Sequence, residues 1–306
     1  MTKWGLVATI KAPVAEILHF AAYHLDRGAH RLYIYLDDDN QAAFVPLKAH
    51  PKIRVTLCND AHWKKLGGRP KKHQVRQTLN ATHAYNRRAE VDWLIHMDVD
   101  EFLWPETGVA DTLAALSPDI HCARIRPIES IAGDGTLFKG FIPAGPDRAE
   151  TVRQIYPNFG VYIKGGFLSH VAGKLFVRIG KENVTLRIHN MFCNDDMNPG
   201  LTELSEISLC HCHSKSWSDW LATYRYRLEK GSYRADLAPS APYGMTLHEM
   251  FHQIEATNGE AGLRAFYDEV CADSKTLRAA LQSRGLLRRC DLDLDRKSKE
   301  QFPNFA

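Results

Sequence analysis

The sequence lacks the long apolar runs, the paired cysteines and the strong charge imbalance that mark several classes of protein. No stretch approaches the ~20 consecutive apolar residues that a membrane-spanning helix needs. Seven cysteines are scattered among 306 residues, an odd number that does not suit a closed disulfide framework and favours a reducing compartment. The net charge of +3 does not by itself point to nucleic acid or to a membrane surface.

Several motifs of common enzyme classes are missing as well. The sequence contains no G-x-S-x-G, no Walker loop and no G-x-G-x-x-G, so a serine hydrolase, a P-loop NTPase and a typical dinucleotide oxidoreductase lack support. Residues 1–10 carry one lysine and an apolar run of about five residues, too short for the core of a secretory signal. We therefore expect a cytoplasmic protein, with work at the inner face of a membrane as a further option.

The first hundred residues alternate between apolar strands and helices. Apolar residues recur at i, i+3 and i+4 between Pro13 and Gly28, which predicts an amphipathic helix that opens at the proline and closes at the glycine. Such alternation predicts an α/β fold with a mainly parallel sheet, in which ligands bind beyond the carboxyl ends of the strands. The expected strands are 5–10, 31–36, 53–57 and 93–97, with a polar helix over about 71–89 before the last of them.

The second half of the chain is less regular and reads as mixed α and β structure. An aromatic stripe formed by Trp217, Trp220 and Tyr224 occurs at helical spacing, and we interpret it as core. Expected strands are 122–127, 174–179, 184–188 and 207–213, and expected helices are 217–229, 246–256, 260–271 and 274–283.

The most informative stretch is an acidic turn that follows an apolar strand. Residues 93–97 lead directly into Asp98-Val99-Asp100-Glu101. On an extended chain, side chains at i and i+2 project to the same side, so Asp98 and Asp100 would face one way. A pair of carboxylates suits a hard cation such as Mn²⁺ or Mg²⁺, with phosphate oxygens completing its coordination. The alternative is an acidic loop that caps a following helix.

This stretch resembles the D-x-D motif of nucleotide-sugar glycosyltransferases with a GT-A fold, and its D-x-D-E-F form resembles the family 2-like and family 92-like transferases. Other segments resemble the same group, in the same order, over residues 5–230. They are Glu16 with Tyr23-His24 and Gly28, Tyr33-Ile34-Tyr35-Leu36-Asp37-Asp38, Gly173-Lys174 with Arg178, Ile188-His189, and LCHCHSKSW at 209–217.

The resemblance implies a metal-dependent glycosyltransferase of the hexosyltransferase type. It would move a sugar from a nucleotide sugar, with a UDP-sugar expected, to a hydroxyl of a glycan or lipid-linked glycan, in keeping with surface polysaccharide synthesis. The implied fold is a GT-A-like (Rossmann-like) nucleotide-sugar-binding half over 1–110, a mixed acceptor-side half over 111–230 and a C-terminal helical extension over 231–306. Peripheral membrane association would be compatible with such an acceptor.

Roles for individual residues follow from the same resemblance. Asp98 and Asp100 would hold Mn²⁺ or Mg²⁺ and the donor diphosphate, with Asp100 at the reacting centre. A histidine late in the fold would add a metal ligand; we choose His211 and keep His213 and His189 as alternatives. Asp37 or Asp38 would contact the base or the ribose of the nucleotide.

Three further positions complete the expected donor site, and one acid is the expected base. Arg69 and Gln74 precede the strand that carries the acidic turn, and Lys174 begins a later strand, so all three are expected donor contacts. An inverting reaction needs a carboxylate to deprotonate the acceptor. Glu129 is our choice for that base; the alternatives are Asp134, Asp195 and Asp196.

A basic stretch over 64–88 leaves a second function open. It contains eight lysines or arginines and no acid. Such a stretch is typical of a nucleic-acid surface or of a solvated helix face. Here its lysine and arginine side chains can also bind the diphosphate of a sugar nucleotide. The alternative function is therefore a non-catalytic module that binds nucleic acid or sugar nucleotides through this stretch.

Overall fold

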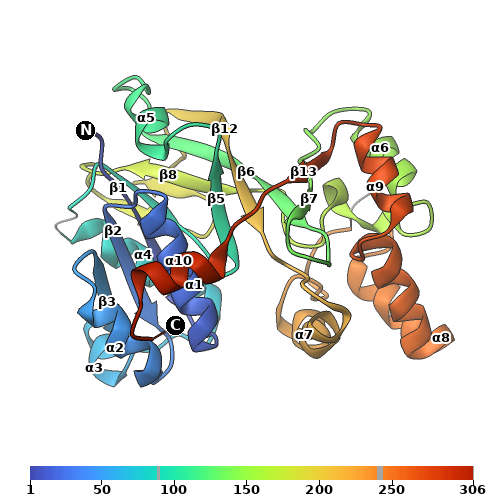
Figure 1. Cartoon of the computed structure of the whole chain (residues 1–306), viewed down its shortest axis with the longest axis horizontal. Coiled ribbons are helices and arrows are strands. Elements are labelled where there is room, and N and C mark those ends of the chain that lie inside the picture. The colour runs from blue at the N-terminus through green and yellow to red at the C-terminus, as the bar shows by residue number, and fades with distance from the viewer. Residues whose placement is uncertain (88–89, 240–243, 306) are drawn as a thin grey trace. The chain divides into compact units, whose positions relative to one another are not determined.

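Four parallel strands form the N-terminal part of a mixed sheet, which confirms the expected α/β class. Their order in the sheet is β3, β2, β1, β4. Helices connect them, as Figure 1 shows. The strands are β1 (Trp4–Ile10), β2 (Arg31–Leu36), β3 (Ile53–Leu57) and β4 (Trp93–His96); the helices are α1 (Val14–Asp26), α2 (Gln41–Ala49), α3 (Asp60–Lys65) and α4 (His73–Asn86).

The order of these strands reverses at β1. Strands β2 and β3 are added on one side of β1, whereas β4 is added on the other, with Val7 opposite both Tyr33 and His96. In open α/β sheets, ligands bind at such a switch point, outside the carboxyl ends of the strands. The acidic turn that follows β4 therefore begins at the position in the sheet where a ligand is expected.

Antiparallel strands continue the sheet beyond β4. Strand β8 (Lys174–Arg178) pairs with β4, and β6 (Cys122–Ser130) pairs with β8. A separate three-stranded sheet consists of β9 (Val184–Leu186), β10 (Met191–Cys193) and β11 (Asp196–Met197). Strand β12 (Leu201–His211) pairs with β6 and with β5 (Glu101–Pro105), and helix α5 (Val109–Ala114) follows β5.

The computed structural model describes residues 1–87, 90–239 and 244–305, and the chain forms two compact units. The first unit comprises Met1–Arg126, Gly173–Leu209 and Leu292–Ala306, and the second comprises Pro127–Ala172 and Cys210–Asp291. The division into 1–110, 111–230 and 231–306 stays a prediction. None of the described helices combines the length and apolar character needed to cross a membrane.

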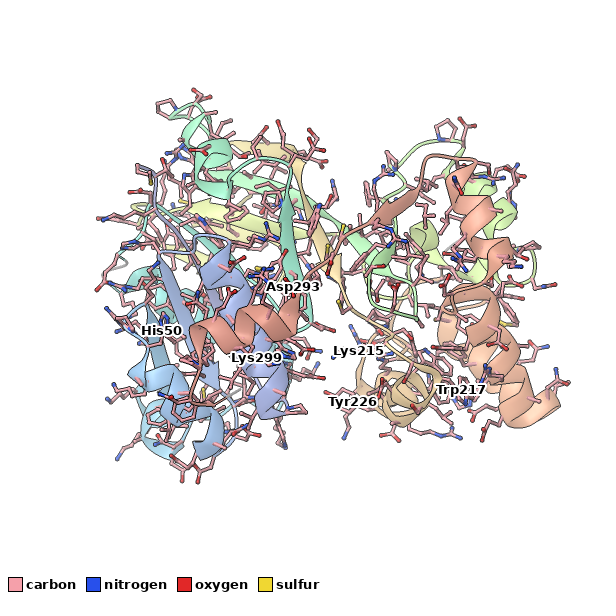
Figure 2. All side chains as sticks on the ribbon, in the orientation of Figure 1. His50, Lys215, Trp217, Tyr226, Asp293 and Lys299 are labelled. Carbon is pink, nitrogen blue, oxygen red and sulfur yellow. The ribbon has the colours of Figure 1, made fainter. Side chains whose placement is uncertain are left out.

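The chain ends in the first unit with helix α10 (Leu294–Gln301), which packs on α1. Figure 2 labels Asp293 just before this helix and Lys299 near its end. Lys297 is buried, with its ammonium 3.7 Å from the carboxylate of Asp26 and over the ring of Tyr23. An ion pair and a cation–π contact thus hold this charged helix against an apolar one.

The second unit is built around an aromatic core. Trp220 and Tyr224 of α7 are buried among aromatic residues of α8, which confirms the interpretation of the aromatic stripe as core, whereas Tyr226 is exposed on the same helix (Figure 2). The expected helices 246–256 and 260–271 are the two parts of α8, which is interrupted at Gly259. The unit contains β7 (Leu137–Lys139), α6 (Arg148–Ile155), α7 (Trp217–Lys230), α8 (Leu247–Val270), α9 (Lys275–Gln282) and β13 (Leu287–Arg289).

Gly173 allows β8 to begin beside β6. Its φ is +72°, and a Cβ added there would overlap the carbonyl oxygen of Ile125. We predict that Gly173→Ala lowers the free energy of unfolding by more than the roughly 1–3 kcal/mol that left-handed backbone costs a non-glycine residue. Urea unfolding measures the loss. Gly180→Ala is the control, because its φ is +110° but nothing lies within 4 Å of an added Cβ. Equal losses in the two variants would contradict the close approach at Gly173.

Candidate functional site

The acidic turn follows β4, and one carboxylate in it is held by two other elements. Gln77 of α4 donates to Asp98 Oδ1 at 2.5 Å, and Lys174 of β8 donates to Asp98 Oδ2 at 2.6 Å. The side chain of Asp98 is still 31% exposed. Asp98 is therefore oriented by the protein while remaining within reach of a ligand.

Lys174 is an ammonium with no access to solvent. Its side chain is 0% exposed, and its Nζ lies 3.2 Å from Glu101 Oε2, whose side chain is also 0% exposed. Burial by itself lowers the pKa of Lys174, but the carboxylates of Asp98 and Glu101 outweigh this effect and raise the pKa above its ordinary value. Lys174 thus stays protonated and joins β8 to the acidic turn.

The chain turns between the two aspartates instead of staying extended. Glu101 donates its backbone N–H to the carbonyl of Asp98, and the Glu101 carboxylate accepts from the backbone N–H of Asp98. Val99 and Asp100 form the turn, and Asp100 is half-buried. The extended-chain argument for Asp98 and Asp100 does not describe this geometry, because local hydrogen bonds close the loop into a tight turn.

A neutral histidine lies directly before the turn. His96 is 4% exposed, and neither ring nitrogen has a hydrogen-bond partner among the residues that the structure describes. Burial, assisted by the positive charge of Lys174, lowers the pKa of His96 to about 3. The residue therefore adds no positive charge beside Lys174 at neutral pH.

Asp37, which follows β2, is bound by two arginines of the basic stretch. Arg69 and Arg76 donate to the Asp37 carboxylate at 2.9 and 2.8 Å, and His73 lies 3.6 Å from it. Burial raises the pKa of Asp37, but His73 and the two guanidinium groups outweigh it and lower the pKa. Asp38 is half-buried. Two of the eight cations of this stretch are thus engaged with a buried acid, and Arg88 lies outside the described residues.

A cavity of about 400 Å³ adjoins α4 in the first unit. Gln74 and Thr78 of α4 line it on one side, and Arg187 and His189 line it on the other. His189 donates from Nδ1 to the carbonyl of Gly173 at 2.8 Å, because a carbonyl oxygen only accepts. Gln74, one of the residues expected to contact the donor, therefore lines this cavity. His189, an alternative metal ligand from the family resemblance, lines it too.

The expected late histidine, His211, is the last residue of β12. Its ring centroid lies 5.2 Å from that of His170 and 5.4 Å from that of His213. The strand begins at Leu201 and ends at His211, earlier than the expected 207–213, so His213 lies beyond it and the two histidines do not follow strand alternation. His213 instead has its Nε2 3.3 Å from the hydroxyl of Tyr233.

Glu101 of the first unit, and His170 and His211 of the second, carry side chains of kinds that can bind metal ions. Of these three, only His211 was an expected ligand, with His213 and His189 as its alternatives. Glu101 was visible in the D-x-D-E-F motif but received no role, and His170 gave no signal because it lies outside the expected strands and helices.

The expected base, Glu129, is deeply buried in the second unit. It is 2% exposed, its Oε1 accepts from Lys139 Nζ at 2.6 Å, and the backbone N–H groups of Leu168 and Ser169 donate to its carboxylate. Burial raises the pKa of Glu129, but the charges of Lys139 and His213 outweigh it and hold the pKa well below its usual range. A carboxylate with a low pKa is a weak proton acceptor.

No family model matches the chain, and no curated protein sequence matches it either. Distantly similar solved structures include the following two. HddC from Yersinia pseudotuberculosis is 12% identical over 59% of this chain and 75% of that chain, with a TM-score of 0.30. The glycosyltransferase GlyE of Streptococcus pneumoniae TIGR4 is 14% identical over 90% of this chain and 66% of that chain, with a TM-score of 0.33. At this level of similarity, neither structure establishes a function for this chain.

Replacement of Lys174 tests how the turn is held. We predict that Lys174→Met lowers the free energy of unfolding by about 3–5 kcal/mol, because Glu101 is left as a buried charge without this partner. Asp98→Asn is the matched variant. It should cost about 1 kcal/mol or less, since Asp98 is partly exposed and Glu101 keeps Lys174. Chemical unfolding measures both, and equal losses would show that the Lys174–Glu101 pair does not hold the turn.

Proposed function

We propose that this protein is a metal-dependent glycosyltransferase that uses a nucleotide-sugar donor, with a UDP-sugar as the expected donor and a glycan or lipid-linked glycan hydroxyl as the acceptor. The observation that supports it most is the position of the acidic turn at the switch point of the parallel sheet, where Asp98 is oriented by Gln77 and Lys174 and is partly exposed. A GT-A-like organisation of the first unit is part of this proposal.

Mn²⁺ or Mg²⁺ is the proposed cofactor, with Asp98, Asp100 and His211 as its ligands. Carboxylate oxygens suit both cations, and the late histidine is taken from the family resemblance. The cation would neutralise negative charge on the leaving diphosphate.

The donor nucleotide is proposed to contact the loop after β2 and the start of α4. Arg69 keeps 44% of its side chain exposed while it binds Asp37, so it can reach a ligand. Gln74 lines the cavity beside α4. Asp37 is buried and engaged by arginines, so its proposed role is to position Arg69, while Asp38 remains the expected contact for the base or ribose.

Transfer requires three changes at the donor and acceptor. The acceptor oxygen forms a bond to the anomeric carbon, the bond from that carbon to the diphosphate oxygen breaks, and the hydroxyl proton passes to a base. Asp100 is proposed at the reacting centre. Lys174 is proposed to act on the nucleotide-sugar donor indirectly, by positioning Asp98, because its ammonium is buried against that carboxylate. Glu129 is proposed as the base if the reaction inverts configuration.

The alternative function as a nucleic-acid- or sugar-nucleotide-binding module has less support from the basic stretch than its charge count suggests. Arg69 and Arg76 bind Asp37. The exposed cations of this stretch among the described residues include Lys64, Lys65, Lys71 and Lys72. Binding of a polynucleotide that falls steeply with salt would favour this alternative.

Metal-dependent nucleotide binding is the first test. We expect UDP to raise the melting temperature of the wild type in the presence of Mn²⁺ but not in its absence, since a ligand at 100 times its Kd stabilises the folded state by about 2.7 kcal/mol. Asp98→Asn and Asp100→Asn should each lose this shift and the transfer activity. Thermal unfolding with a panel of nucleoside diphosphates measures the shift.

Asp111→Asn is the control, because Asp111 is an exposed acid of α5 in the same unit. It should retain both the shift and the activity. Full transfer activity in both Asp98→Asn and Asp100→Asn would contradict the proposal that these two residues bind the metal ion.

Glu129 needs a test that separates folding from chemistry. Glu129→Gln leaves the buried ammonium of Lys139 without its partner, so we predict a loss of about 3–5 kcal/mol in the free energy of unfolding. The double variant Glu129→Gln with Lys139→Met should recover most of it. If Glu129 is the base, the folded double variant lacks transfer; transfer at the wild-type rate would remove Glu129 from the reaction.

A further inference from the structure

The first turns of α8 carry two histidines that the proposed function does not use. The sequence there is His248-Glu249-Met250-Phe251-His252, which has the H-E-x-x-H spacing of helical zinc-binding histidines. Residues at i and i+4 are neighbours on one side of a helix. His248 is half-buried and His252 is exposed, so the pair is open to an ion from solvent.

The two imidazoles are already close to the spacing that a metal requires. Their Nε2 atoms lie 3.1 Å apart and their ring centroids 4.5 Å apart. Two nitrogen ligands on a tetrahedral Zn²⁺, each about 2.0–2.1 Å from the ion, are separated by roughly 3.3 Å. The 3.1 Å approach is a hydrogen bond between the two rings, and opening it while turning the rings toward a common point would admit the ion.

A backbone contact sets the tautomer of the first histidine. His248 Nδ1 lies 3.1 Å from the carbonyl oxygen of Tyr233, which only accepts, so Nδ1 carries the proton. The Nε2 of neutral His248 then presents a lone pair toward His252. Metal-binding histidines are commonly oriented in this way by a hydrogen bond from their other ring nitrogen.

The glutamate of the motif is engaged elsewhere. Glu249 Oε2 accepts from the backbone N–H of Thr246 at 2.8 Å and from its hydroxyl at 3.0 Å, while Thr246 caps α8. In zinc hydrolases with this spacing, the glutamate acts as the base on the metal-bound water. Here the carboxylate belongs to a capping box, which argues against hydrolysis and leaves the two imidazoles as the ligands that this motif supplies.

We infer that His248 and His252 form a Zn²⁺ site through their Nε2 atoms, with water completing the coordination. Imidazole nitrogen suits Zn²⁺, whereas Mg²⁺ and Mn²⁺ prefer the oxygen ligands of the acidic turn, so the two sites select different ions. The ion would bridge two successive turns of α8. This inference does not depend on the glycosyltransferase proposal, because neither histidine is part of that site.

Calorimetric titration of the full chain with ZnCl₂ tests the site, in buffer with excess MgCl₂ to occupy oxygen-rich sites. We expect His252→Gln and His248→Gln to lose one equivalent of bound Zn²⁺, or to bind it at least tenfold more weakly. His19→Gln is the matched control, a partly exposed histidine of α1, and should bind as the wild type does. Unchanged stoichiometry and affinity in His252→Gln would overturn the site.

Glu249→Gln separates this site from a hydrolytic one. It removes the charge but keeps a side-chain oxygen that can accept in the capping box, so the melting temperature without metal should stay close to that of the wild type, and Zn²⁺ affinity should stay within about twofold of it. A loss of Zn²⁺ binding as large as that of His252→Gln would overturn a site made of two imidazoles. Electron paramagnetic resonance with Cu²⁺ gives an independent readout, since His252→Gln should remove one coordinated nitrogen.

Discussion

The candidate site depends on the ion pairs that the buried ammonium of Lys174 forms with the acidic turn. Lys174 forms ion pairs with both Asp98 and Glu101, and the Glu101 carboxylate accepts from the backbone N–H of Asp98, which closes the acidic turn. Lys174 can reach them because β8 runs antiparallel beside β4. Asp98 is therefore already paired with Lys174 before a metal ion binds, and this pairing keeps the turn ordered. The affinity of Asp98 for a metal ion would then depend on the strength of its ion pair with Lys174.

The same electrostatic rule recurs at two other acids. Asp37 is bound by Arg69 and Arg76, and Glu129 is bound by Lys139. Burying a carboxylate costs desolvation free energy unless a cation or hydrogen bonds compensate for it, and a basic side chain provides this compensation at each of these acids. Part of the basic stretch before β4 thus serves the fold, and its charge count overstates what is available to a polyanion.

Local patterns predicted much of the fold. The helix between Pro13 and Gly28 and the strand over residues 31–36 lie where their apolar periodicity places them, as α1 and β2. Predictions failed where partners decide the structure: β12 begins at Leu201 with polar residues because it pairs with β5 and β6. Helix α10 was not among the expected elements, because its sequence is strongly charged and its stability comes from packing on α1.

The α/β class and the acidic turn after a buried strand can be predicted without a structure, since both arise from contiguous residues and their periodicity. Which of these residues meet depends on how the whole chain folds. Lys174 binds Asp98 across 76 positions and Arg76 binds Asp37 across 39, and no local pattern encodes such distances. The tertiary structure also decided that Glu129 is a buried ion pair and that Glu249 caps a helix beside two facing histidines, because burial and partner geometry exist only once the chain has folded.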